Sequence, residues 1–141
     1  MKHHGSAEWV GGLKDGKGRV STESGVLSNA QYSFKTRFED SKGTNPEELI
    51  GAAHAACFSM ALAGQLEKVG LQPDTIKTTA TVTLEKSSDG FSIPAIHLQA
   101  NVKIPGADKG LFDKAAKDAK EGCPVSKLMR ATITMDARLE D

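Results

Sequence analysis

One run of apolar and small residues limits what this chain can fold into. It covers residues 49–63 and is rich in alanine, with Cys57 and Phe58 near its centre. A helix that is apolar on all sides is normally buried on all sides. The run is too short to span a bilayer, which takes about 20 residues. The sequence therefore predicts a central core helix.

Signals at both ends define this helix. Thr44 or Asn45 can cap the free amides, and Pro46 suits the first helical position if Asn45 is the cap. The two acids that follow, Glu47 and Glu48, lie where the helix dipole favours negative charge. The helix is expected to continue to Val69 and to end at Gly70, a residue typical of helix C-caps.

Strand patterns lie on both sides of the helix. Apolar and polar residues alternate over 32–38, which predicts a half-buried strand with Arg37 on its polar face. A second alternation over 75–104 has a turn at 87–90, and Pro94 falls where the parity changes, so a hairpin with a bulge is expected. An amphipathic helix (108–119), a short helix (125–130) and a strand (131–139) follow.

This order of elements predicts an α+β fold in which antiparallel sheets pack around the buried central helix. A single sheet covers only one side of such a helix. Leaving several large side chains exposed would cost about 1.5–3 kcal/mol each. We therefore expect a homodimer packed around the central helices.

Composition restricts the function. The 141 residues fit one domain, 1–141, with 18 basic and 18 acidic residues and no formal net charge. That balance argues against nucleic-acid and membrane partners, and aromatic residues are only 5%, too few for base stacking. The N-terminus does not resemble a secretion signal, so a cytoplasmic location is expected.

The two cysteines are the candidate reactive groups. Cys57 lies in the core helix, where a small apolar side chain also fits simple packing. Cys123 precedes a proline at a predicted helix start, where free amides stabilise a thiolate, although the Gly-Cys-Pro corner also suits a turn. In the functional interpretation, Cys57 attacks a peroxide oxygen and becomes a sulfenic acid, which then condenses with Cys123 to a disulfide.

A Cys57 thiolate needs a cation, and Arg37 with Glu47 is the candidate pair. Arginine stays charged and can form a bidentate pair with a carboxylate. The alternatives are a solvated strand residue and an ordinary acid at a helix start. Glu47 and Cys57 are ten residues apart, roughly 15 Å along a helix. A compact site would therefore form most simply at a dimer interface.

His54 precedes Cys57 by three residues and shares its helix face. This leaves two rival chemistries open. One is a hydrolase that uses Cys57 with His54. The other is a metal site formed by His54, Cys57 and Cys123. Neither has support from a nucleophile elbow, a Cys-x-x-Cys pair or an evident oxyanion loop.

Two motifs together resemble the OsmC/Ohr family, the osmotically inducible and organic-hydroperoxide-resistance proteins. They are TNPEELIGAAHAACFSMA at 44–61 and GCPVS at 122–126. The segments TESGVL at 22–27 and TRFE at 36–39 look like the OsmC branch. The resemblance covers essentially the whole chain. It implies an OsmC-like α+β fold and an intertwined homodimer.

The resemblance also implies an activity and a set of residues. Cys57 resembles the family's peroxidatic cysteine, Cys123 its resolving cysteine, and Glu47 its glutamate ten residues before the reactive cysteine. The arginine departs from the Ohr pattern, because Leu13 and Lys14 follow the first Gly-Gly turn here. Arg37 is therefore the choice, and Arg19 the fallback.

The expected function is a thiol-dependent peroxidase, induced by stress, that reduces organic hydroperoxides and reduces hydrogen peroxide less well. It needs no metal or cofactor, and an external thiol or dithiol reopens the disulfide. The alternative is a non-enzymatic binder of a lipid-like ligand in an apolar cavity at the dimer interface. A thiol titration separates the two, because a binder has an unreactive Cys57.

Overall fold

The computed structural model describes residues 1–140, and the chain divides into two compact units, 1–49 and 50–141. The first contains β1 (Gly5–Val10), β2 (Lys17–Thr22), β3 (Ala30–Tyr32) and α1 (Phe34–Phe38). The long helix α2 (Pro46–Lys68) begins in the first unit and lies mostly in the second. The second unit continues with β4 (Thr75–Ser87), β5 (Gly90–Lys103), α3 (Lys109–Gly122), α4 (Pro124–Leu128) and β6 (Thr132–Glu140). The α+β class is confirmed.

The strand expected over 32–38 is wrong. Only Ala30–Tyr32 is a strand there, paired antiparallel with β2, and Phe34–Phe38 forms helix α1. Ser33 and Thr36 build a capping box: the Thr36 amide donates to Ser33 Oγ over 3.3 Å, and the Ser33 amide donates to Thr36 Oγ1 over 2.8 Å. These local bonds override the alternating pattern. Arg37 therefore lies on a helix.

The predicted ends of α2 are confirmed. The Glu48 amide donates to Asn45 Oδ1 over 2.8 Å, so Asn45 is the cap and Pro46 the first helical residue. At the other end, the Leu71 amide bonds the Leu66 carbonyl over 2.9 Å, and Gly70 takes a φ of 75°. A glycine adopts this left-handed conformation without the cost that a Cβ would add.

The prediction that α2 is buried on all sides does not hold for the single chain. Within the second unit, its buried side chains form one stripe at a helical spacing of four: His54, Phe58, Leu62 and Leu66. Ala52, Ala53 and Ala56 are exposed, and Met60 is 79% exposed. The sheet and α3 lie on one side of the helix, so the opposite side lacks a cover within the second unit.

By length and composition, α2 could cross a membrane. It has 23 residues, and an 18-residue stretch of it has a mean hydropathy of 1.4 and is 28% buried. The expectation that the apolar helix is too short to span therefore fails on length. The core helix of a soluble protein can be equally long and apolar. The buried stripe of α2 packs against the sheet, which is typical of a core helix.

The sheet of the second unit has the order β4-β5-β6. The hairpin is confirmed: β4 and β5 pair antiparallel, with a register shift between Thr83 and Glu85, close to the expected bulge at Pro94. The expectation of antiparallel pairing throughout is wrong for β6, which pairs parallel to β5 from Ala95↔Thr132 onward. Parallel neighbours need a long crossover, and the connection through α3 and α4 supplies it.

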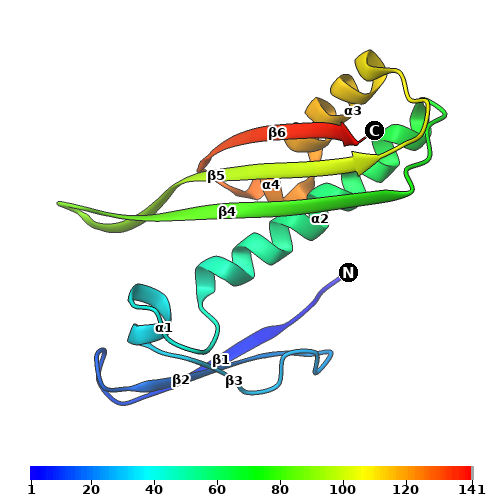
Figure 1. Cartoon of the computed structure of the whole chain (residues 1–141). Coiled ribbons are helices and arrows are strands. Elements are labelled where there is room, and N and C mark those ends of the chain that lie inside the picture. The colour runs from blue at the N-terminus through cyan, green and yellow to red at the C-terminus, as the bar shows by residue number, and fades with distance from the viewer. Residues whose placement is uncertain (141) are drawn as a thin grey trace. The chain divides into compact units, whose positions relative to one another are not determined.

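The core of the second unit forms between this sheet and the helices α2 and α3, which lie on one face of it (Figure 1). The apolar face of β5 supplies Leu98, Ala100 and Val102, and α3 supplies Phe112 with three alanines. Cys57 and Cys123 both pack at this core. The core therefore fixes the segments that carry the two thiols.

Candidate active site

The structure brings the two cysteines together. Cys57 lies on α2 and is half-buried, whereas Cys123 is 1% exposed and lies between α3 and α4, where it caps both helices. Both are free thiols, and Cys123 lies close enough to Cys57 to raise the pKa of the Cys57 thiol. The sequence separates these residues widely, and the packing of α3 onto α2 makes them neighbours.

The surroundings of Cys57 do not favour its ionised form. Burial raises the pKa of the Cys57 thiol, and the neighbouring Cys123 raises it further. The backbone amide of Val125 acts in the opposite direction, since a hydrogen bond to the sulfur lowers the pKa of Cys57. The net shift is upward. A reactive thiolate at neutral pH therefore requires an additional positive charge.

Cys123 is held by Ser126 and, through it, by His54. The Ser126 amide donates to Cys123 Sγ over 3.3 Å, and the Cys123 thiol donates to Ser126 Oγ over 3.2 Å. The same hydroxyl lies 2.8 Å from His54 Nε2. His54 is fully buried, and burial lowers its pKa, so the neutral imidazole is favoured.

The rival roles for His54 lack geometric support. Its Nε2 is hydrogen-bonded to Ser126, and no group of three or more His, Cys, Asp or Glu side chains that could hold a metal occurs in residues 1–140. Ser126 was missed in the sequence. A cysteine at a helix N-cap brings the residue three positions later next to the sulfur, and this spacing was the available signal.

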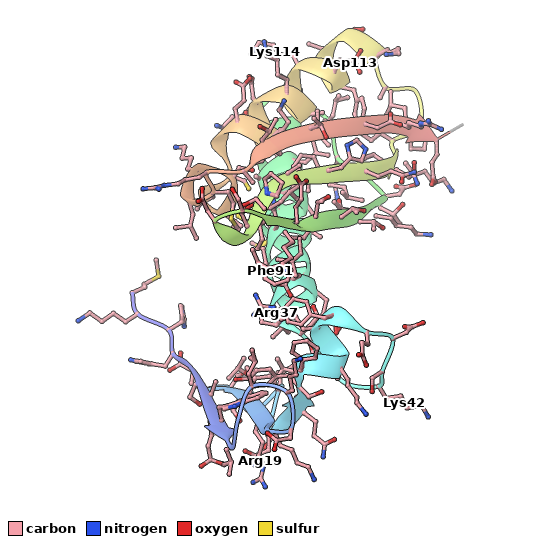
Figure 2. All side chains as sticks on the ribbon, turned by 90° about the vertical axis from the view of Figure 1, so that its left-hand side faces the viewer. Arg19, Arg37, Lys42, Phe91, Asp113 and Lys114 are labelled. Carbon is pink, nitrogen blue, oxygen red and sulfur yellow. The ribbon has the colours of Figure 1, made fainter. Side chains whose placement is uncertain are left out.

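Arg37 and Glu47 form an ion pair within the first unit. Arg37 Nε and Nη2 donate to Glu47 Oε1 over 3.0 and 2.7 Å. Glu47 is 8% exposed, and its Oε2 is buried with no hydrogen-bond partner among residues 1–140. The guanidinium carbon also lies 5.4 Å from the centre of the Phe38 ring. Arg37 lies on helix α1 (Figure 2).

The pairing depends on how α1 and α2 begin and end. Asn45 caps α2, and its side-chain amide also donates to the Thr36 carbonyl over 3.0 Å, which ties the two helices together. Arg19, the fallback arginine, is exposed on β2. Glu47 thus has Arg37 as its partner, as expected.

A small apolar hollow of about 160 Å³ lies in the first unit. Its lining comprises Ala7, Val20, Tyr32, Thr44, Asn45, Pro46 and Leu49. Ligand pockets for drug-sized molecules usually measure roughly 300–1,000 Å³. Within one chain this hollow is therefore too small for a lipid-like ligand.

Known proteins resemble this chain over nearly its whole length. The family model described as OsmC-like protein matches residues 39–138. Peroxiredoxin OsmC of Escherichia coli is 56% identical over 136 residues, covering 96% of this chain and 95% of that protein. Organic hydroperoxide resistance protein OhrB of Bacillus subtilis is 31% identical over 124 residues, 87% of this chain and 88% of that protein.

Solved structures agree with the fold. The crystal structure of Bacillus subtilis OhrB aligns with a TM-score of 0.68 at 25% identity, covering 97% of this chain and 98% of that one. An OsmC-like protein of unknown function from Vibrio cholerae aligns with a TM-score of 0.77 at 16% identity, covering 98% of this chain and 99% of that one.

Proposed function

This chain belongs to the OsmC-like protein family, and we propose that Cys57 is its peroxidatic and Cys123 its resolving cysteine. The protein is a cysteine-based, thiol-dependent peroxidase for organic hydroperoxides. The observation that supports the residue assignment is that the two free thiols lie close together at the core of the second unit. A peroxidase that forms an intramolecular disulfide needs such a pair.

The reaction has three steps. The Cys57 thiolate attacks the terminal hydroperoxide oxygen, so an S–O bond forms, the O–O bond breaks and an alcohol leaves after taking up a proton. Cys123 then attacks the sulfenic sulfur, forming the S–S bond and releasing water. An external thiol or dithiol reduces the disulfide by exchange and restores both thiols.

We propose that Arg37, oriented by Glu47, supplies the positive charge that the Cys57 thiolate needs. The two charge-assisted hydrogen bonds to one carboxylate oxygen fix the guanidinium, and they favour Arg37 over Arg19. Guanidinium donors not used by Glu47 can stabilise the thiolate and the departing alkoxide. The proposed catalytic set is therefore Cys57, Cys123, Arg37 and Glu47. We also propose that the chain works as one domain, 1–141, and that it uses no cofactor.

We propose a homodimer that covers the open side of α2. Met60 is 79% exposed and lies among exposed alanines on that side. We expect the wild-type protein to sediment as a dimer, and Met60→Lys to shift it toward the monomer, because a buried lysine charge is costly. Ser88→Lys, in the exposed hairpin turn, is the control and should remain dimeric. A wild-type monomer at all concentrations would contradict the proposal.

A direct assay tests the activity and its preference. Peroxide consumption with dithiothreitol should be faster with cumene hydroperoxide than with hydrogen peroxide, because apolar residues surround Cys57. Mass spectrometry after one equivalent of peroxide should find a Cys57–Cys123 disulfide. Equal or faster turnover of hydrogen peroxide would contradict the preference. We further propose that the protein is soluble and lies in the cytoplasm, because reducing thiols are available in that compartment.

A further inference from the structure

A buried hydrogen-bonded chain lies behind the proposed resolving cysteine. It runs from the Cys123 thiol to Ser126 Oγ over 3.2 Å and from that hydroxyl to His54 Nε2 over 2.8 Å. All three residues are at most 7% exposed: Cys123 1%, Ser126 7% and His54 0%. The chain links three elements of the second unit, since His54 lies on α2, Cys123 at the α3–α4 junction and Ser126 on α4.

The hydrogen-bond roles along this chain have one consistent direction. The Cys123 thiol donates to Ser126 Oγ, so the serine hydroxyl proton is free to point to His54 Nε2. A neutral imidazole with its proton on Nδ1 accepts that bond. His54 Nδ1 itself is buried and has no hydrogen-bond partner among residues 1–140. Packing alone gives no reason to bury an imidazole with one nitrogen unsatisfied.

We propose that Ser126 and His54 form a proton relay that activates Cys123 for disulfide formation, an inference that rests on the proposed peroxidase function. The thiol must lose its proton before its sulfur can attack. Ser126 Oγ touches the reacting thiol and takes this proton as it passes its own to His54 Nε2. The Ser126 amide, 3.3 Å from Cys123 Sγ, stabilises the thiolate that forms.

The step balances without an added reactant. The Cys123 sulfur forms a bond to the Cys57 sulfur, and the S–O bond of the sulfenic acid breaks. Cys123 is oxidised and the sulfenic sulfur is reduced. The hydroxide that leaves takes up the one proton that Cys123 gave to the relay and departs as water, and this transfer returns Ser126 and His54 to their neutral state. Ser126 acts as a catalytic residue, and His54 acts through it as a positioning residue and proton acceptor.

Single-turnover kinetics separate this role from peroxide reduction. The enzyme in its full dimeric form is mixed with one equivalent of cumene hydroperoxide, and dimedone trapping follows the Cys57 sulfenic acid while mass spectrometry follows the disulfide. In Ser126→Ala we expect sulfenic acid to form at the wild-type rate. Disulfide formation should slow by on the order of 10²-fold, a usual loss for a proton-transfer group.

Two further variants distinguish proton transfer from packing. Ser126→Thr keeps the hydroxyl and should restore most of the disulfide rate. His54→Asn keeps a hydrogen-bonding group but cannot accept a proton, so it should resolve as slowly as Ser126→Ala. Ser59→Ala is the matched control, because this α2 hydroxyl bonds to the Ala55 carbonyl and Thr78 instead of a cysteine. It should behave as the wild type.

The results can overturn the relay in separate ways. Disulfide formation at the wild-type rate in both Ser126→Ala and His54→Asn would overturn it. Equal slowing of sulfenic acid formation and of disulfide formation would assign a structural role instead. If the protein were not a peroxidase, the result would differ from both of these outcomes. The wild-type protein would then give no dimedone adduct on Cys57 and no disulfide at all.

Discussion

Cys57→Ser should reduce peroxide consumption with dithiothreitol to the uncatalysed background. The loss is expected to be on the order of 10³-fold or more, as for other covalent nucleophiles, because a serine hydroxyl does not ionise at neutral pH. The readout is the rate of cumene hydroperoxide loss per enzyme. The side chains are nearly equal in size, so the far-ultraviolet circular dichroism spectrum should not change.

Cys123→Ser provides the contrast. It leaves Cys57 in place, so one equivalent of peroxide should still be consumed and the Cys57 sulfenic acid should accumulate, while the intramolecular disulfide disappears. The pair of variants therefore distinguishes the attacking sulfur from the resolving one. Full turnover by Cys57→Ser would refute the assigned nucleophile, and complete loss of turnover in Cys123→Ser together with an active Cys57→Ser would exchange the two roles.

Arg37→Met should lower the rate at neutral pH by about 10²-fold. Burial and Cys123 raise the pKa of Cys57, and a lost guanidinium leaves that shift without compensation. A group with a raised pKa ionises only at higher pH. The variant's rate should therefore rise as pH increases beyond the range where the wild type has levelled off. Peroxide consumption measured from pH 6 to 10 gives both profiles.

Glu47→Gln should have a smaller effect in the same direction. The amide oxygen can still accept a hydrogen bond from Arg37, but the charge that holds the guanidinium is lost. Arg19→Met is the matched control, since Arg19 is exposed on β2 and should leave both rate and pH profile unchanged. An Arg19→Met defect with a normal Arg37→Met variant would reverse the choice of arginine.

Local sequence signals predicted most elements correctly. The Asn45 cap, the Gly70 terminus, the hairpin turn and the buried face of α3 all follow from contacts within a few residues. The same local rules failed at 32–38. There the aromatic alternation indicated a strand, but a Ser33–Thr36 capping box fixed a helix, because its two hydrogen bonds satisfy backbone and side-chain groups at once.

Long-range pairing was beyond such signals. The alternation over 131–139 predicted a strand correctly but carried no information about its direction, and the crossover through α3 and α4 makes it parallel to β5. The expected burial of α2 likewise depends on what packs against it. Its apolar composition is visible in the sequence, whereas the single buried stripe follows from where the sheet and α3 lie.

The sequence by itself identified the two cysteines as candidate reactive residues, Arg37 and Glu47 as a candidate pair, and the core helix, since residue types and short spacings carry that information. Only the tertiary structure decided that Ser126 bridges Cys123 and His54 and that the environment of Cys57 opposes its ionisation. The physical reason is distance along the chain. His54 and Ser126 are 72 residues apart, and their contact exists only because α4 packs against α2.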